Sequence, residues 1–216
     1  MKHTKVTFPG GDGQLVGLLH QGDPHLPRVI ICHPHPLYGG TMRNKVVYWI
    51  ARLFEARGHT VLRFNFRGVE ESEGAWDEGF GESDDVIAAI DFLQIFHETL
   101  HEMQTDNGRS DLYWLAGFSF GAFAALSAAR QDARIERMFA IAPAVNLWDF
   151  AFVAHESRRI DVVYAEEDEI VPSELLQDWL AHHPHIRAQK IVGAGHFFPD
   201  HKEEMCSALC DFIATP

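Results

Sequence analysis

The sequence predicts an α/β fold, with a mostly parallel central sheet, an antiparallel hairpin at its amino-terminal edge and helices on both faces. Short strand-like segments alternate with helix-length segments along most of the chain, an order that requires parallel strands joined by helical crossovers. Residues 28–32 form an apolar run of the kind that is buried on both faces of a sheet. At residues 113–126 a short apolar strand, a glycine-flanked turn and a helix rich in small residues follow one another directly.

The first half of the chain supplies the edge hairpin and the first helical crossovers. A turn at 9–13, which contains three glycines, joins the two halves of the hairpin, and Gly58 ends the first helix. That helix carries an apolar stripe, formed by Val46, Trp49, Ile50 and Leu53. The expected elements are strands at 5–8 and 14–19, a strand at 28–32, a helix at 45–57, a strand at 60–66, and a helix that Ser83 or Asp84 caps and that runs to about Gln104.

The second half continues the alternation. The expected elements are strands at 113–116, 135–141, 160–164 and 186–192, and helices at 122–129, 173–181 and 200–213. Reactive groups in such sheets gather at the carboxyl ends of the strands. We therefore expect the functional side chains in the loops that follow strands.

Length and composition limit the classes of protein. A chain of 216 residues is expected to form one domain, residues 1–216. Its formal net charge of −13 argues against nucleic acid and anionic membranes as partners. The amino-terminal segment is polar and no run of 18 apolar residues occurs, so a cytoplasmic protein is expected. The three cysteines do not indicate a disulfide framework.

A candidate nucleophile lies in the segment Gly117-Phe118-Ser119-Phe120-Gly121, which fits the pattern GxSxG. A serine at a sharp strand-to-helix turn needs small residues two positions before and two positions after it, where strand and helix approach each other. The turn would expose the Ser119 hydroxyl and aim the Phe120 N–H at the same point. A serine hydroxyl needs a base, and the base needs an acid that orients it.

The candidate acid and base lie in two later loops. Residues 165–172 contain four acids, and the pattern DxxVP before a helix favours Asp168. The alternative for Glu166, Glu167 and Glu169 is a solvated acidic loop. His196 follows the strand at 186–192, between glycines that let an imidazole approach the serine. Asp161 begins its strand at the opposite end of the sheet.

The loop His33-Pro34-His35-Pro36-Leu37 is the expected source of a second N–H for an oxyanion hole, beside that of Phe120. Proline has no N–H, so only His33, His35 and then Leu37 can donate from the beginning of this loop. We favour His35 and keep Leu37 as the alternative. The side chains of the two histidines are expected to brace the loop. Other histidines could suggest a metal site, but no supporting ligand spacing accompanies them and none is expected: His97, His101, His182, His183 and His185.

The chain resembles the α/β-hydrolase superfamily, and within it a group of small, lidless bacterial serine hydrolases. The likeness covers nearly the whole chain and rests on HPHPLYGGTMRNKVV at 33–47, RFNFRGVEESEG at 63–74 and GFSFGAF at 117–123. The resemblance implies a triad of Ser119, Asp168 and His196. Two positions depart from the group, because Glu70 and Ala165 stand where glycine is usual. They leave the shape of the pocket rim, and so the choice of substrate, open.

The site is expected to be open and shallow. A cap in this superfamily usually follows the sixth strand, and the 17 residues from 143 to 159 are too few to form one. Trp148, Phe150 and Phe152 could form an acyl-side wall, or alternatively core or a contact in a homodimer. Leu37 and Tyr38 are further candidates for binding substrate.

The activity that the resemblance implies is hydrolysis of a carboxylic ester or thioester of a small molecule through an acyl-enzyme, without a cofactor. Two alternatives remain at this stage. The first is a peptidase acting on short peptides or acylated amino acids. The second is a catalytically silent fold that only binds.

Overall fold

A computed structural model describes residues 2–101 and 110–215, which form an eight-stranded sheet. The strands are β1 (Thr4–Gly10), β2 (Gly13–His20), β3 (Arg28–Cys32), β4 (Val61–Asn65), β5 (Tyr113–Phe118), β6 (Ile135–Ile141), β7 (Arg159–Ala165) and β8 (Arg187–Ile191). The helices are α1 (Lys45–Glu55), α2 (Phe80–His101), α3 (Phe120–Ala129), α4 (Ser173–Ala181) and α5 (Lys202–Ala214), with short 3-10 helices η1 (Pro36–Tyr38) and η2 (Ala151–His155).

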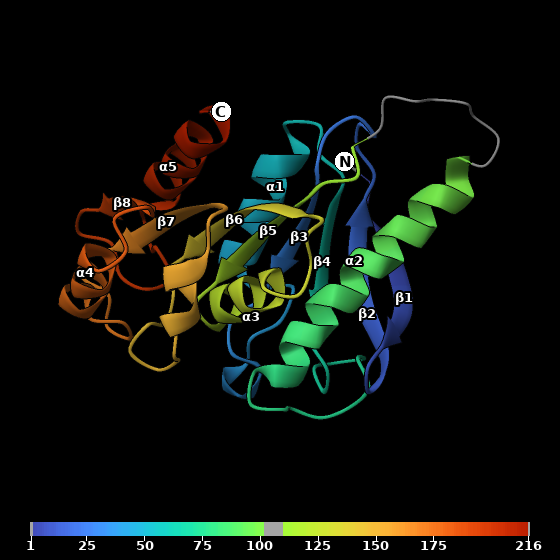
Figure 1. Ribbon diagram of the computed structural model, residues 1–216, viewed down its shortest axis with the longest axis horizontal. Helices are drawn as coiled ribbons and strands as arrows, with labels where there is room; N and C mark the ends of the chain where they lie inside the picture. Colours follow the sequence, from blue (N-terminus) through green and yellow to red (C-terminus); the bar gives the residue numbers. More distant parts are fainter. Residues whose placement is uncertain (1, 102–109, 216) are drawn as a thin grey trace.

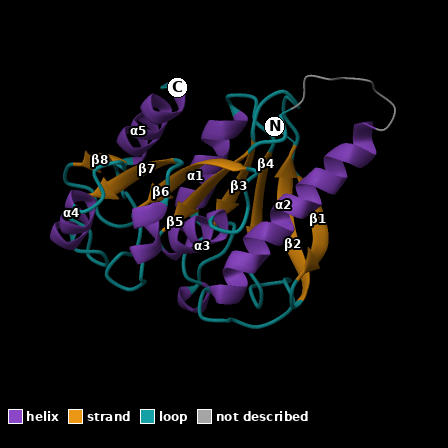
Figure 2. Ribbon diagram, viewed as in Figure 1, coloured by secondary structure: helices purple, strands orange, loops and turns teal. Residues whose placement is uncertain are grey.

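The strand order is β1-β2-β4-β3-β5-β6-β7-β8. The pairs β1–β2 and β2–β4 are antiparallel, and every pair from β4–β3 to β7–β8 is parallel. The ribbon shows α2 and α3 in front of the sheet and α1 behind it (Figures 1 and 2). The predicted α/β fold, with an antiparallel edge hairpin and helices on both faces, is confirmed, and no cap domain is evident in the described residues.

The core has two halves, one on each face of the sheet. In β3, Ile30 and Cys32 pack on the side of α2 and α3, whereas Val29 and Ile31 pack on the side of α1 and α5. All four side chains are fully buried, as a central parallel strand requires. Each buried aliphatic side chain of this kind contributes about 1.5–3 kcal/mol to the free energy of unfolding.

Helix α2 begins at Phe80, three residues before Ser83, so the predicted cap at Ser83 or Asp84 is wrong. The buried carboxylate of Glu82 accepts the backbone N–H groups of Asp77 (3.0 Å) and Gly79 (2.8 Å) just before the helix. Ser83 instead donates its hydroxyl to the carbonyl of Gly79 inside the first turn. The predicted end at Gln104 lies outside the described residues.

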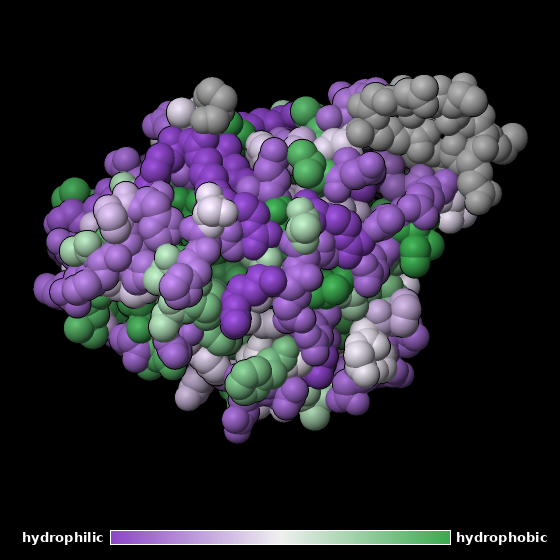
Figure 3. Space-filling model, viewed as in Figure 1, coloured by the Kyte–Doolittle hydropathy of each residue, from purple (hydrophilic) through white to green (hydrophobic). Residues whose placement is uncertain are grey.

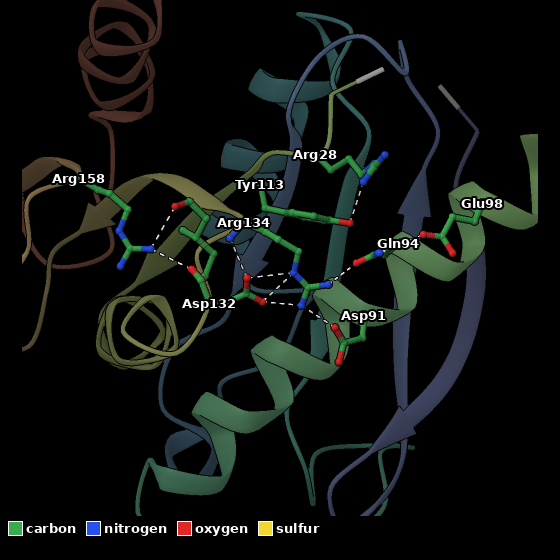
Figure 4. A network of polar contacts seen from close by, with 9 residues as sticks. Arg28, Asp91, Gln94, Glu98, Tyr113, Asp132, Arg134 and Arg158 are labelled. Carbon is green, nitrogen blue, oxygen red and sulfur yellow. Dashed lines mark hydrogen bonds and ion pairs between the residues drawn. The ribbon is translucent and has the colours of Figure 1, made fainter. Parts of the chain in front are cut away.

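A polar network fastens α2 to the chain just before β6 (Figure 4). The guanidinium of Arg134 contacts the carboxylates of Asp132 and Asp91, the latter at 2.6 Å, and the side-chain oxygen of Gln94. Because Arg134 immediately precedes β6, this network lies at the amino ends of the parallel strands. It stabilises the end of the sheet at which the parallel strands begin, which is opposite the loops that follow the strands.

The face of the molecule that carries α2 and α3 is mostly hydrophilic, with apolar side chains in small groups (Figure 3). None of the helices in the described part of the chain is long and apolar enough to cross a membrane.

Candidate active site

Ser119 lies at a sharp turn between β5, which ends at Phe118, and α3, which begins at Phe120. Its backbone has φ 56° and ψ −119°, a region that side-chain-bearing residues rarely adopt. The Ser119 N–H donates to the carbonyl of Ile141 at 2.8 Å, which anchors the turn to β6. The strand, strained turn and helix expected from GxSxG are therefore present.

Two glycines make this turn possible. A Cβ atom at Gly117 would lie 2.2 Å from the carbonyl oxygen of Gly121. A Cβ atom at Gly121 would lie 2.3 Å from the carbonyl oxygen of Cys32, in β3. Real Cβ atoms do not come so close to backbone, so both positions exclude any side chain, as the pattern predicts.

Asp168 and His196, from the loops after β7 and β8, are in direct contact. The imidazole Nδ1 of His196 lies 2.8 Å from one carboxylate oxygen of Asp168 and 3.0 Å from the other. Asp168 Oδ1 also accepts the backbone N–H groups of Ile170 (2.9 Å) and Val171 (2.7 Å). Both side chains are almost fully buried, at 2% and 3% exposure. Three hydrogen bonds thus hold the carboxylate in one orientation toward the ring.

Two of the three neighbouring glutamates, Glu166 and Glu169, make specific contacts, whereas Glu167 is exposed. Glu166 accepts hydrogen bonds from Lys190 (2.7 Å) and the backbone of Gly193 (3.1 Å), and its pKa is lowered first by the Lys190 hydrogen bond. Glu169 accepts the backbone N–H of His196 at 2.9 Å. These contacts join the loop after β7 to the loop after β8. Neither contact was predicted, because an acidic side chain in a loop carries no sequence signal of the backbone group that it binds.

Asp161 is excluded from the site, as expected. It is fully buried near the start of β7, where its carboxylate binds the guanidinium groups of Arg137 (2.7 Å) and Arg187 (2.6 Å). These contacts tie three neighbouring strands together, so Asp161 is a structural ion-pair partner.

A cavity of about 470 Å³ brings the candidate residues together. Ser119 and His196 both line it, and Phe120 and His35 line it beside them. The remaining wall consists of Pro34, Tyr38, Gly39, Gly40, Asn44, Ala144, Leu147, Trp148, Ile170 and Phe197. The serine, the imidazole and both expected N–H donors thus border one space, at the carboxyl edge of the sheet.

The histidine loop is braced by its own side chains. His33 is fully buried, its Nδ1 donates to the carbonyl of Pro34 (2.6 Å), and its Nε2 accepts the N–H of Phe66 (3.1 Å). Burial lowers the pKa of His33 to about 4, which keeps the ring neutral at neutral pH, as an accepting Nε2 requires. The expected bracing role of the histidines is confirmed.

The same loop distinguishes the two N–H groups considered for the oxyanion hole. The Leu37 N–H donates to His35 Nδ1 at 3.2 Å, so it already has an acceptor. Within the described residues, no acceptor takes the backbone N–H of His35 or that of Phe120. This difference favours His35 over Leu37 as the second donor.

The aromatic residues after β6 separate into wall and core. Trp148 lines the cavity and packs against Phe123, with ring centroids 4.9 Å apart. Phe150 is 2% exposed and belongs to the core, and Phe152 lies outside the cavity against the guanidinium of Arg130. The acyl-side wall is therefore wrong for Phe150 and Phe152, and the alternative of core packing is correct: Phe150 belongs to the buried core and Phe152 packs against it.

Of the other candidates for substrate contact, Tyr38 lines the cavity and Leu37 does not. Leu37 is 66% exposed and borders an adjacent depression with Trp76 and Glu70. Leu37 is next to Tyr38 in the sequence but does not share its place in the cavity, because the 3-10 helix η1 points successive side chains in different directions. The lining residues Leu147, Ile170 and Phe197 were missed, although the last two lie within two residues of Asp168 or His196.

The departure at Glu70 has a local explanation. Glu70 adopts φ 50°, the left-handed region in which glycine is unstrained. Its carboxylate accepts a hydrogen bond from Asn65 Nδ2 at 2.7 Å and lies 3.6 Å from Arg43. These contacts offset the backbone strain, so the rim keeps the glycine-like turn and gains a carboxylate.

The chain is similar to several known proteins. The family model described as X-Pro dipeptidyl-peptidase (S15 family) matches residues 14–190. An uncharacterized protein of Rickettsia prowazekii is 35% identical, over 98% of this chain and 89% of its own. Two solved structures are each 32% identical: a putative α/β hydrolase from Agrobacterium tumefaciens (TM-score 0.87, 97% of this chain and 94% of that chain) and a lidless serine hydrolase from Xanthomonas campestris (TM-score 0.83, 100% and 98%).

Proposed function

This chain belongs to the α/β-hydrolase superfamily, in the family of the S15 X-Pro dipeptidyl-peptidase model, and we propose that it hydrolyses carboxylic ester or thioester bonds of small substrates. The nucleophile is Ser119, the base is His196 and the orienting acid is Asp168. The observation that carries the proposal is the contact of Asp168 with His196 Nδ1, at 2.8 Å, beside the cavity that Ser119 and His196 share.

The reaction has two steps. In the first, the Ser119 oxygen attacks the carbonyl carbon while His196 Nε2 takes the hydroxyl proton. The tetrahedral intermediate collapses when the bond between its carbon and the leaving group breaks, which is a C–O bond in an ester and a C–S bond in a thioester. The imidazolium returns the proton to that leaving group. In the second step, His196 activates a water molecule that releases the acid and restores the serine. Asp168 stabilises the imidazolium in both steps.

The backbone N–H groups of Phe120 and His35 bind the negative oxygen of each intermediate. Both donors border the cavity beside Ser119, and neither has an acceptor within the described residues. Preorganised donors of this kind are worth several kcal/mol to the transition state. Because both donors are backbone N–H groups, the proposed stabilisation of the oxyanion needs no cofactor.

The cavity favours a neutral acyl group over a charged peptide terminus. Among the described residues, no Asp, Glu, Lys or Arg side chain lines it, and apolar side chains form most of its wall. A dipeptidyl peptidase would bind the free ammonium of its substrate, and an ammonium without a carboxylate partner pays a desolvation penalty of several kcal/mol. An esterase therefore suits this cavity better than a peptidase of the kind that gives the family its name.

A substrate panel tests this choice. We expect kcat/KM for p-nitrophenyl butyrate or a short acyl-CoA to exceed that for a Gly-Pro p-nitroanilide with a free amino terminus by at least about 100-fold. The matched control is the same anilide with an acetylated amino terminus, which removes the charge and keeps the shape. Preference for the free amine over both the acetylated anilide and the esters would contradict the proposal and support the peptidase.

Trp148 is expected to form the acyl wall. Replacing Trp148 with Ala should raise KM for p-nitrophenyl octanoate about 10-fold, because roughly two methylene groups lose their apolar cover, and should change KM for the acetate little. Steady-state kinetics along a series of chain lengths measure the effect. Leu37→Ala, an exposed apolar change outside the cavity, is the control. A Trp148 variant with unchanged KM at every chain length would remove the wall from the account.

A further inference from the structure

Two histidines and a buried carboxylate lie close together at the open end of the β1–β2 hairpin, away from the catalytic cavity. His3 immediately precedes β1, His20 ends β2, and Glu55 ends α1. Thr4 pairs with Leu19 in the antiparallel ladder, so His3 and His20 oppose each other at the next position. One ligand atom from each of the three side chains lies within 4.8 Å of the other two.

Each histidine offers a ring nitrogen to the shared space. His3 Nε2 lies 2.7 Å from Glu55 Oε1. His20 Nδ1 lies 3.3 Å from the backbone carbonyl of Lys2, which leaves Nε2 as the nitrogen available to a ligand. A backbone carbonyl on the other ring nitrogen is the usual way in which proteins orient a metal-binding histidine.

The carboxylate is held with one oxygen toward the histidines. The Glu55 side chain is 1% exposed, and its Oε2 contacts Arg52 at 2.9 Å. Its Oε1 faces His3. Burying a carboxylate is costly unless each oxygen has a cationic or hydrogen-bonding partner. Arg52 is that partner for Oε2, and His3 Nε2 is the partner of Oε1 at 2.7 Å. A metal ion bound by His3 and Glu55 would take the place of the proton in this hydrogen bond.

We propose that His3, His20 and Glu55 bind a divalent transition-metal ion of the zinc class. Two imidazole nitrogens and one carboxylate oxygen are a zinc donor set, and water would complete a four-coordinate site. Donors around tetrahedral zinc lie about 3.4 Å apart. His3 Nε2 and Glu55 Oε1, which are 2.7 Å apart, must therefore separate slightly, and a pair at the 4.8 Å limit must close by a little over 1 Å. The ion would link the two ends of the edge hairpin to the end of α1. This differs from the expectation of no metal, which considered only histidines elsewhere in the chain.

Zinc titration of the untagged, chelator-treated full-length protein tests the site. We expect one Zn²⁺ per chain by calorimetry, and a rise in Tm of about 5–10 °C when free zinc is 100-fold above Kd. Co²⁺ should give the visible absorption of a tetrahedral nitrogen and oxygen site. His3→Gln and His20→Gln should each weaken binding at least about 10-fold, because each removes a ligand.

Two comparisons make the test specific. His185→Gln, which alters an exposed histidine in another histidine-rich segment, should leave the zinc affinity unchanged. The His3 and His20 variants change strand-end side chains, so their Tm without zinc should remain close to that of the parent protein. Absence of 1:1 binding at micromolar zinc would overturn the proposal. So would binding that survives both His3→Gln and His20→Gln, or that is lost in His185→Gln.

Discussion

Replacing Ser119 with Ala is expected to lower kcat/KM for p-nitrophenyl butyrate by at least about 10⁴-fold while the protein stays folded. The hydroxyl is the only group removed, and without it no acyl-enzyme forms. Alanine has a Cβ like serine, so the strained backbone at φ 56° is equally accessible. The free energy of unfolding should change by less than about 1 kcal/mol. Hydrolysis assays and denaturant unfolding of the two proteins measure both quantities.

Ser127→Ala is the matched control for this change. It also removes one serine hydroxyl, but from a residue within α3 that does not line the cavity. It should retain the parent activity. If Ser119→Ala kept more than a few per cent of the parent kcat/KM, another group would be the nucleophile. If Ser127→Ala lost activity equally, the loss would report on α3 and not on the hydroxyl.

Replacing Asp168 with Asn is expected to lower kcat/KM by about 10³–10⁴-fold. Asparagine keeps Oδ1 as the acceptor for the N–H groups of Ile170 and Val171, so its amide nitrogen takes the place of Oδ2. That nitrogen donates to His196 Nδ1, which must then carry no proton. The proton moves to Nε2, the atom that has to accept the serine proton. The wrong tautomer, not a changed shape, causes the loss.

Glu167→Gln is the control for the charge, because Glu167 is exposed and adjacent to Asp168. It should leave kcat/KM within about twofold of the parent value, since exposed charges are strongly screened. Unchanged activity in Asp168→Asn would show that Asp168 does not orient the base. Equal losses in both variants would show that the acidic loop acts through its total charge.

The sequence predicted the bounds of β3, β6 and α4 correctly. Every residue of β3 is buried, whereas α4 buries only Ser173 and Leu176, so burial on both faces explains the first agreement and not the last. The start of α2 was missed, because a carboxylate inside the helix, Glu82, caps the preceding backbone. General preferences for Ser and Asp at helix starts could not reveal that partner.

In the candidate site, too, some features could be predicted from the sequence and others could not. The glycines around Ser119 follow from steric exclusion along one segment, which a sequence displays directly. The choice of Asp168 among four acids came from its position before a helix, and the structure places it against His196. Contacts that depend on how distant loops pack were not predictable, such as Glu169 with the His196 backbone. The pairing of His3 with His20 likewise requires the strand register, and Glu55 joins them only through packing of α1.

Fluorophosphonate labelling of the purified protein tests the central claim most directly, because only an activated serine reacts with this probe. Intact mass and peptide mass spectrometry should find one adduct per chain, located on Ser119, and labelling should be slowed at least about 100-fold in Asp168→Asn and His196→Ala. A protein that only binds its ligand would remain unlabelled. No adduct on the parent protein, or an adduct on a residue other than Ser119, would contradict the account.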